Sequence, residues 1–192
     1  MSEYSHMNSQ WVELSNAARA RMAIEAVRRR SPGLPGFVCF YGAAGSGKST
    51  LMVRMACDYD AAYLYLPPLG RQVTGSWLLR ELVSELGSEP SRYTSENFRS
   101  IIEMERRESR MIVVDECENG LVGSGIETLR AIHDITGCPI VLCGMQGLPR
   151  RLRALPQLIS RISNWIEMQP PTLADCRLLA DKLSEIESRT IC

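Results

Sequence analysis

The sequence predicts an α/β fold in which helices cover both faces of a central parallel sheet. Short apolar runs alternate with longer segments of helical periodicity, the order expected of strand–helix–strand units. These runs are apolar at nearly every position, as in parallel strands that are buried on both faces. A Gly-rich loop joins the first strand-like run to an apolar helix. With 192 residues, of which 45% are hydrophobic, the chain can form one substantial domain with a small appendage.

The first half of the chain should supply two strands and four helices. Breakers delimit them: Pro32-Gly33 closes the first helix, Pro67-Pro68 ends the second strand, and Thr74 is a good N-cap for the helix that follows. The predicted elements are a helix over 16–30, a strand over 37–41, a helix beginning at Ser49, a strand over 61–66, a helix over 77–87 and a helix over 95–107.

The second half continues the alternation. It should contain a strand over 111–116, a helix over 126–136, a strand over 139–144, an Arg-rich helical stretch over 148–159 and a final helix over 172–187. Pro170-Pro171 separates the last helix from the rest. We therefore expect a mobile N-terminal segment over 1–15, a nucleotide-binding core over 16–169 and a minimal C-terminal lid over 170–192.

Composition narrows the class of protein. The 22 basic and 22 acidic residues balance, so DNA binding would depend on local Arg clusters and not on an overall positive field. The chain has no run of about 18 apolar residues and no N-terminal signal pattern, which predicts a cytoplasmic protein without a membrane partner. Its seven cysteines are scattered and form no metal-type pair, so we expect buried, reduced thiols.

The loop after the first strand has the spacing of a phosphate cradle. The pattern Gly42-x4-Gly47-Lys48-Ser49 matches the P-loop, in which glycines turn successive backbone N–H groups toward the phosphates of a nucleotide. Lys48 would reach the β- and γ-phosphates, and Ser49 would offer its hydroxyl to Mg2+. The following helix would point the positive end of its dipole at the same phosphates. Lys48 is one of only two lysines, which suggests a specific requirement at this position.

Two acids supply the other half of an NTPase site. Asp115 and Glu116 end the apolar run that begins at Met111. In P-loop NTPases an acid at such a strand end holds Mg2+, and an adjacent acid can polarise the attacking water. The pair therefore favours an ATP hydrolase with its own base over a GTPase or a small-molecule kinase. Glu118 is a further acid nearby, which we interpret as a surface residue.

Three segments together resemble AAA+ ATPases: Gly42 to Ser49, Val113 to Glu118, and Ile140 to Gly144. Within that class, residues 129–144 and 158–162 look like the transposition ATPases of the phage Mu B protein and TnsC/TniB type. The resemblance implies a P-loop AAA+ three-layer domain with a central parallel sheet and a short helical lid. It also implies ATP as ligand and Mg2+ as cofactor. The implied nucleotide-binding residues are Gly42, Ala44, Gly45, Ser46, Gly47, Lys48, Ser49 and Thr50.

The resemblance also implies roles for single residues. Lys48 and Glu116 would act in catalysis, and Ser49 and Asp115 would hold the metal. Arg161 follows Ser160 in a segment where such ATPases present an arginine finger to the neighbouring subunit's γ-phosphate. Three other arginines compete for that role: Arg150, Arg151 and Arg153.

Members of the resembled group assemble as rings or helical filaments on duplex DNA and recruit a transposase. The resemblance therefore implies a homo-oligomer, duplex DNA and a transposase as partners. Non-specific DNA binding needs cations that contact phosphates. The segment between the second strand and the acidic strand offers Arg71, Arg92, Thr94 and Arg99 for this purpose.

One departure affects the expected rate. Met145 stands where a polar residue, often Asn, usually follows the strand over 139–144, and Gln146 could substitute for it. We therefore expect slow hydrolysis that assembly or DNA stimulates. Two alternatives stay open: a helicase-loader-like AAA+ ATPase, and a nucleotide-gated scaffold that hardly hydrolyses.

Overall fold

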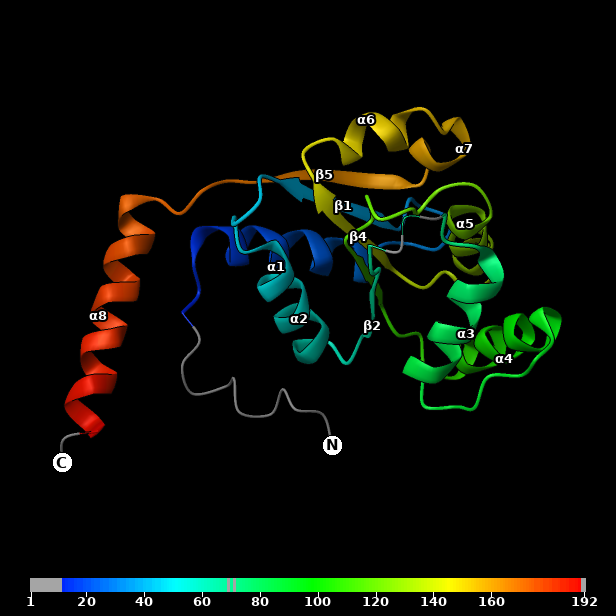
Figure 1. Cartoon of the computed structure of the whole chain (residues 1–192), viewed down its shortest axis with the longest axis horizontal. Coiled ribbons are helices and arrows are strands. Elements are labelled where there is room, and N and C mark those ends of the chain that lie inside the picture. Colours follow the sequence, from blue (N-terminus) through cyan, green and yellow to red (C-terminus); the bar gives the residue numbers. More distant parts are fainter. Residues whose placement is uncertain (1–11, 69, 71, 191–192) are drawn as a thin grey trace.

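In the computed structural model, which describes residues 12–68, 70 and 72–190 with side chains to residue 182, five parallel strands form a sheet in the order β2-β3-β4-β1-β5 (Figure 1). The strands are β1 (Phe37–Gly42), β2 (Ala62–Tyr65), β3 (Ile112–Asp115), β4 (Ile140–Met145) and β5 (Ile162–Met168). The helices are α1 (Ser15–Arg28), α2 (Lys48–Asp58), α3 (Gly75–Glu85), α4 (Thr94–Arg107), α5 (Ser124–Thr136), α6 (Leu148–Arg153), α7 (Pro156–Ile159) and α8 (Leu173–Thr190).

Helices cover both faces of this sheet and create two hydrophobic cores. One core joins α1 and α2 to the sheet, and the other joins α3 to α7 to the opposite face. Successive side chains of β1 point to opposite faces of the sheet, so this strand contributes to both cores. Phe37 and Cys39 belong to one core, and Val38 belongs to the other. The predicted three-layer α/β fold with a central parallel sheet is confirmed.

The strand β5 was not predicted from the sequence. Polar residues interrupt its apolar pattern, because Ser163 and Glu167 are exposed at the sheet edge while Ile162 and Met168 are buried. An edge strand has a neighbour on one side only, so it does not need a continuous apolar run. β5 pairs in parallel with β1 and makes β1 an interior strand.

The helical stretch predicted over 148–159 is two short helices, α6 and α7. Pro156 occupies the first turn of α7, and the preceding Leu155 has φ −113° and ψ 86°, outside the helical region. Proline disfavours helical geometry in the residue before it, which ends α6 and starts a new helix.

The last helix, α8, stands apart from the sheet (Figure 1). Its first turn is tied to the start of α1, because the Asp175 carboxylate accepts hydrogen bonds from the N–H and hydroxyl of Ser15 at 2.8 and 2.9 Å. The division of the chain into a core over 16–169 and a lid over 170–192 stays a prediction. None of the helices that the structure describes is long and apolar enough to cross a membrane.

Candidate nucleotide-binding site

The Gly-rich loop lies at the carboxyl end of β1 and leads directly into α2. Gly45 and Gly47 have φ values of +76° and +78°, a conformation that side-chain-bearing residues rarely adopt. Gly47 is the residue before α2, so the first N–H groups of α2, which have no acceptor within the helix, open beside this loop. A loop of this shape at a helix N-terminus is suited to bind an anion such as a phosphate group.

Gly42, the last residue of β1, is held against β5. A Cβ atom at this position would lie 2.7 Å from the main-chain oxygen of Met168, a distance that requires the backbone to move. The glycine that begins the P-loop pattern is therefore also demanded by the packing of β1 on its neighbouring strand.

Lys48 is buried and its ammonium group lies within the loop. Its Nζ donates to the main-chain oxygens of Gly42 and Ala43 at 3.1 and 2.7 Å, and it lies 3.5 Å from the hydroxyl of Ser46. These contacts place a fixed positive charge in the concave part of the loop. Of the other predicted ligands, Ala44 and Thr50 are exposed and Ser49 is half-buried.

Asp115 is fully buried at the end of β3, and both of its carboxylate oxygens are engaged. The hydroxyl of Tyr63, from the neighbouring strand β2, donates to Oδ2 at 2.9 Å. The main-chain N–H of Glu116 donates to Oδ1 at 2.8 Å. Sequence reasoning missed Tyr63, because only the pairing of β2 with β3 brings this side chain to Asp115.

Glu116 turns the chain sharply after β3. Its φ of +58° is unusual for a residue other than glycine, and such strained positions cluster at functional sites. Burial raises the pKa of Glu116 above its ordinary value, and the charges of Glu118 and Asp115 add to this, while Lys48 opposes it. The structure thus brings Glu116 within electrostatic range of both the Asp115 carboxylate and the loop lysine.

The residues predicted to hold Mg2+ have the right donor chemistry. Ser49 offers a hydroxyl and Asp115 a carboxylate, and Mg2+ is commonly held by one or two such oxygen ligands together with substrate phosphates and waters. Ser49 lies in the first turn of α2, beside the loop that would bind those phosphates.

Arg161 lies at the amino ends of the strands, which we call the amino edge of the sheet. The Gly-rich loop lies at their carboxyl ends, the carboxyl edge or P-loop edge. It precedes β5, and its main-chain oxygen accepts from the N–H of Phe37, the first residue of β1. Its guanidinium forms a bidentate ion pair with Asp134, with Nε–Oδ1 at 2.6 Å and Nη2–Oδ2 at 2.7 Å. Because the six residues of β1 span roughly 20 Å, Arg161 does not reach the loop of its own chain.

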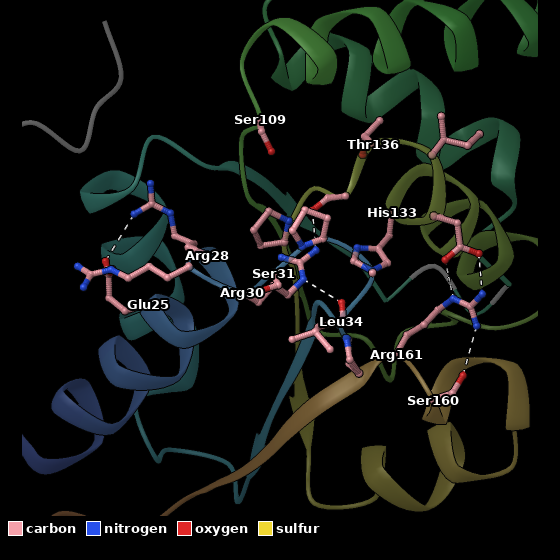
Figure 2. Close-up of a pocket in the computed structure, with 18 residues that line it drawn as sticks. Glu25, Arg28, Arg30, Ser31, Leu34, Ser109, His133, Thr136, Ser160 and Arg161 are labelled. Carbon is pink, nitrogen blue, oxygen red and sulfur yellow. Dashed lines mark hydrogen bonds and ion pairs between the residues drawn. The ribbon is translucent and has the colours of Figure 1, made fainter.

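A hollow of about 1000 Å3 opens beside Arg161 (Figure 2). Its walls come from the end of α1, the segment before β1, and the end of α5. Several basic side chains line it, but Arg30 donates to three main-chain oxygens, those of Val27, Leu34 and Gly137. This hollow is thus separate from the P-loop edge and lies beside the predicted finger.

The arginines that compete with Arg161 lie on α6, which follows β4. Arg151 donates to the main-chain oxygen of Glu118 at 2.9 Å, and Arg153 stacks over the ring of Trp165, 5.1 Å from its centroid. Arg150 is exposed. None of these three arginines lines the hollow.

The predicted DNA contacts lie at the start of α4, apart from Arg71, which falls outside the described residues. Arg92 is exposed and stacks on Tyr93, with its guanidinium carbon 4.6 Å from the ring centroid. The Thr94 hydroxyl donates to that of Ser76 in α3 at 3.0 Å, and Arg99 is exposed on α4. All three described residues are exposed.

Comparison with known proteins identifies the domain. Residues 30–152, well over half of the chain, match a family model described as an AAA domain. The chain belongs to the AAA domain family. This AAA domain also resembles solved structures: Cdc6p from Pyrobaculum aerophilum at 15% identity and a TM-score of 0.66, covering 96% of this chain and 52% of that one.

Two Aeropyrum pernix structures give similar matches to the AAA domain. The ORC2 protein in its ADP form has 15% identity and a TM-score of 0.67, covering 96% of this chain and 55% of that one. The ORC1 protein in complex with DNA has 17% identity and a TM-score of 0.55, covering 88% and 48%. The chain therefore spans about half the length of these proteins. No curated protein sequence matches it.

These comparisons show the family of the domain and its fold. The family model shows an AAA domain, and the solved structures, at 15% identity, show that the fold is shared with Cdc6p and ORC2. The comparisons do not single out the transposition branch of the resemblance.

Proposed function

We propose that this AAA+ domain hydrolyses ATP slowly in assemblies that form on duplex DNA, and that it serves a transposase as its target-selection and activating partner. ATP would bind at the Gly-rich loop of one copy, and Arg161 of a second copy would complete the site. Hydrolysis of ATP would then cause the assembly to dissociate into its subunits. Rings and helical filaments are both consistent with this arrangement.

One observation carries the assembly part of the proposal: the two halves of the site lie at opposite edges of the same sheet. Lys48, Asp115 and Glu116 follow the carboxyl ends of the strands, whereas Arg161 precedes β5 beside the hollow at the amino ends. A site that needs both halves is completed when the amino edge of one copy meets the carboxyl edge of the next.

Each residue of the P-loop edge has a chemical task in this proposal. Lys48 binds the phosphates, and Glu116 orients the attacking water and takes up its proton. When bound, Mg2+ supplies positive charge against the phosphate oxygens. Arg161 of the second copy adds a cation where negative charge develops in the transition state, which would make hydrolysis depend on assembly.

The DNA part of the proposal rests on the exposed surface at the start of α4. Arg92 and Arg99 present guanidinium groups there that form no ion pair with the part of the chain that the structure describes, and Thr94 adds a hydroxyl. Contacts of this type bind phosphates and carry little sequence preference, as a target-selection factor requires. The solved Aeropyrum pernix ORC1 structure, which is in complex with DNA, is compatible with DNA binding by this domain type.

Electron microscopy of the protein with ATP, with and without duplex DNA, tests the proposal. We expect rings or filaments on duplex DNA in the presence of ATP, and their loss in Lys48→Ala. The variant Arg92→Ala with Arg99→Ala should retain ATP binding but bind DNA more weakly and with a smaller salt dependence. The proposal would be overturned if the ATP-bound protein stayed monomeric and did not bind DNA.

A replication-type role is the second candidate. Several of the similar structures are named Cdc6p, ORC or a DNA replication initiation factor, which favours a helicase-loader-like ATPase among the alternatives. Such a protein would prefer single-stranded DNA and a helicase over duplex DNA and a transposase. Competition between labelled duplex and single-stranded DNA of equal length distinguishes the two.

A further inference from the structure

The turn that carries Glu116 is fastened to the end of β4 by Glu118. Oε2 of Glu118 accepts a hydrogen bond from the main-chain N–H of Met145 at 3.1 Å. On the other side, Arg151 of α6 donates to the main-chain oxygen of Glu118 at 2.9 Å. The turn itself is closed by the N–H of Asn119, which donates to the oxygen of Glu116 at 2.8 Å. Fixing Glu118 therefore fixes the turn in which Glu116 lies.

Gly144 makes room for this carboxylate. A Cβ atom at Gly144 would lie 2.4 Å from Oε2 of Glu118, closer than any real contact. The φ of Gly144 is not in the left-handed region, so its backbone conformation does not demand glycine. What the position requires is space, which is occupied first by the Glu118 carboxylate and next by Leu148, whose Cδ2 would lie 3.0 Å from such a Cβ.

The side chain of Met145 is apolar, which makes the contact of Glu118 with this strand end relevant to the chemistry of the site. The sequence places a thioether where a polar side chain is expected at the end of β4, and this sulfur lies 4.0 Å from Nζ of Lys48. Gln146, the expected substitute, is exposed, whereas the half-buried Glu118 carboxylate contacts this strand end from the turn after β3.

We propose that Glu118 is a positioning residue for ATP hydrolysis, which takes the place of the polar side chain that Met145 lacks and holds Glu116 in its reactive orientation through the end of β4. The inference rests on the ATP-hydrolysing part of the proposed function and is independent of DNA, transposase and Arg161. It corrects the interpretation of Glu118 as a surface residue.

Two variants disturb the contact from opposite sides. Glu118→Ala removes the acceptor, and Gly144→Ala pushes the carboxylate away without altering any residue of the P-loop or of the turn. We expect each to lower kcat by between about 10- and 100-fold, because small displacements of a reacting group have effects of this size. KM for ATP and the affinity for a fluorescent ATP analogue should change less than about twofold, since both variants retain Lys48 and Asp115.

Three further variants make the test specific. The double variant should be no slower than the slower single variant, because both act through one contact. Glu118→Gln keeps an oxygen that can accept from the N–H of Met145 and should recover most of kcat. Glu103→Ala, at an exposed position of α4, is the matched control. Thermal unfolding of all variants separates loss of fold from loss of rate.

The outcomes distinguish this inference from the proposed function. Wild-type protein without ATPase activity would remove the proposed function itself. Active wild-type protein with unchanged kcat in folded Glu118→Ala would overturn the inference alone, as would a kcat of Glu118→Gln as low as that of Glu118→Ala, or strictly multiplicative losses in the double variant.

Discussion

The two edges of the sheet differ in how their charged side chains are held. At the carboxyl edge Lys48 and Asp115 are buried, and each has at least one main-chain partner that a strand end or the turn after it fixes in place. At the amino edge Arg161 is partly exposed and forms an ion pair with the side chain of Asp134, and its Nη1 also donates to the main-chain oxygen of Gln157 at 2.6 Å. A partly exposed ion pair contributes little to stability unless it is bidentate, as this one is, but Asp134 would keep Arg130 as a partner at 3.0 Å if Arg161 were drawn away.

The difference separates a preformed half of the site from an exchangeable half. The carboxyl edge holds its charges in the geometry of a phosphate site before any partner arrives, which lowers the cost of binding. In the proposed assembly, a phosphate bound to a neighbouring copy would replace Asp134 as the partner of Arg161 at the amino edge. The following predictions test this contrast, from the largest expected effect to the smallest.

Lys48→Ala should have the largest effect, because it removes the fixed charge of the preformed edge. Truncating one partner of a buried charge pair costs on the order of 4 kcal/mol, or about a thousandfold in Kd for ATP. Titration with a fluorescent ATP analogue measures this. Lys182→Ala, which alters the only other lysine, is the control and should bind ATP normally. Tight ATP binding by Lys48→Ala would contradict a preformed phosphate site.

Glu105, which is buried near the end of α4, should make the free energy of unfolding depend on pH. Its carboxylate oxygens make no hydrogen bond of ordinary geometry with the described residues. Burial raises its pKa from 4.5 to about 7 against an opposing contribution from Arg110. The folded state therefore binds more protons than the unfolded state between these values. Stability should fall as pH rises from 4.5 through 7, by about 3 kcal/mol in total.

Denaturant unfolding between pH 5 and 8 measures this dependence. Glu105→Gln should flatten the profile and stabilise the protein above pH 7, because the amide carries no charge to desolvate. Glu103→Gln, on the exposed side of the same helix, is the matched control and should keep the wild-type slope. An unchanged slope in Glu105→Gln would show that Glu105 does not titrate in this range.

Gly42→Ala should destabilise the carboxyl edge through packing alone. The added Cβ would lie 2.7 Å from the Met168 oxygen, and overpacking of this kind costs about 1–3 kcal/mol. Gly147→Ala is the control, since its Cβ would have no atom within 4 Å and its φ is −75°. The melting temperatures of the two variants, measured by thermal unfolding, test this prediction. Equal melting temperatures would mean that β1 and β5 separate easily at this end.

Tyr63→Phe should have the smallest effect. It removes the hydrogen bond to Asp115 and costs about 1 kcal/mol, or roughly a fivefold loss of kcat if Asp115 loses its orientation. Tyr65→Phe, exposed on the same strand, is the control. Equal kcat in the two variants would show that Asp115 is positioned by the Glu116 N–H without Tyr63.

The part of this molecule that sequence reasoning could predict is the part set by local pattern. Thr74 was expected to cap a helix and accepts from the N–H of Trp77 at 3.2 Å, and β1 follows a continuous apolar run. The Gly-rich loop is equally local, because its spacing and its flanking strand and helix are visible in the chain. The assigned roles of its residues and of Arg161 stay predictions.

The features that escaped prediction arise between segments that are distant in the sequence. β5 becomes a strand because β1 offers it an edge, although its own pattern is half polar. The contact of Tyr63 with Asp115 joins residues 52 positions apart, and that of Glu118 with Met145 joins residues 27 apart. The burial of Glu105 follows from the packing of α4, which its sequence neighbours do not reveal.

The central claim is that one copy's Arg161 completes the site of another. A mixing experiment tests it with two variants that are each expected to be inactive: Glu116→Gln keeps Arg161, and Arg161→Ala keeps Glu116. We predict that an equimolar mixture at assembling concentration hydrolyses ATP several times faster than either variant alone, because mixed interfaces pair an intact Glu116 with an intact Arg161. A mixture no faster than the average of its components, or wild-type activity of Arg161→Ala alone, would contradict the account.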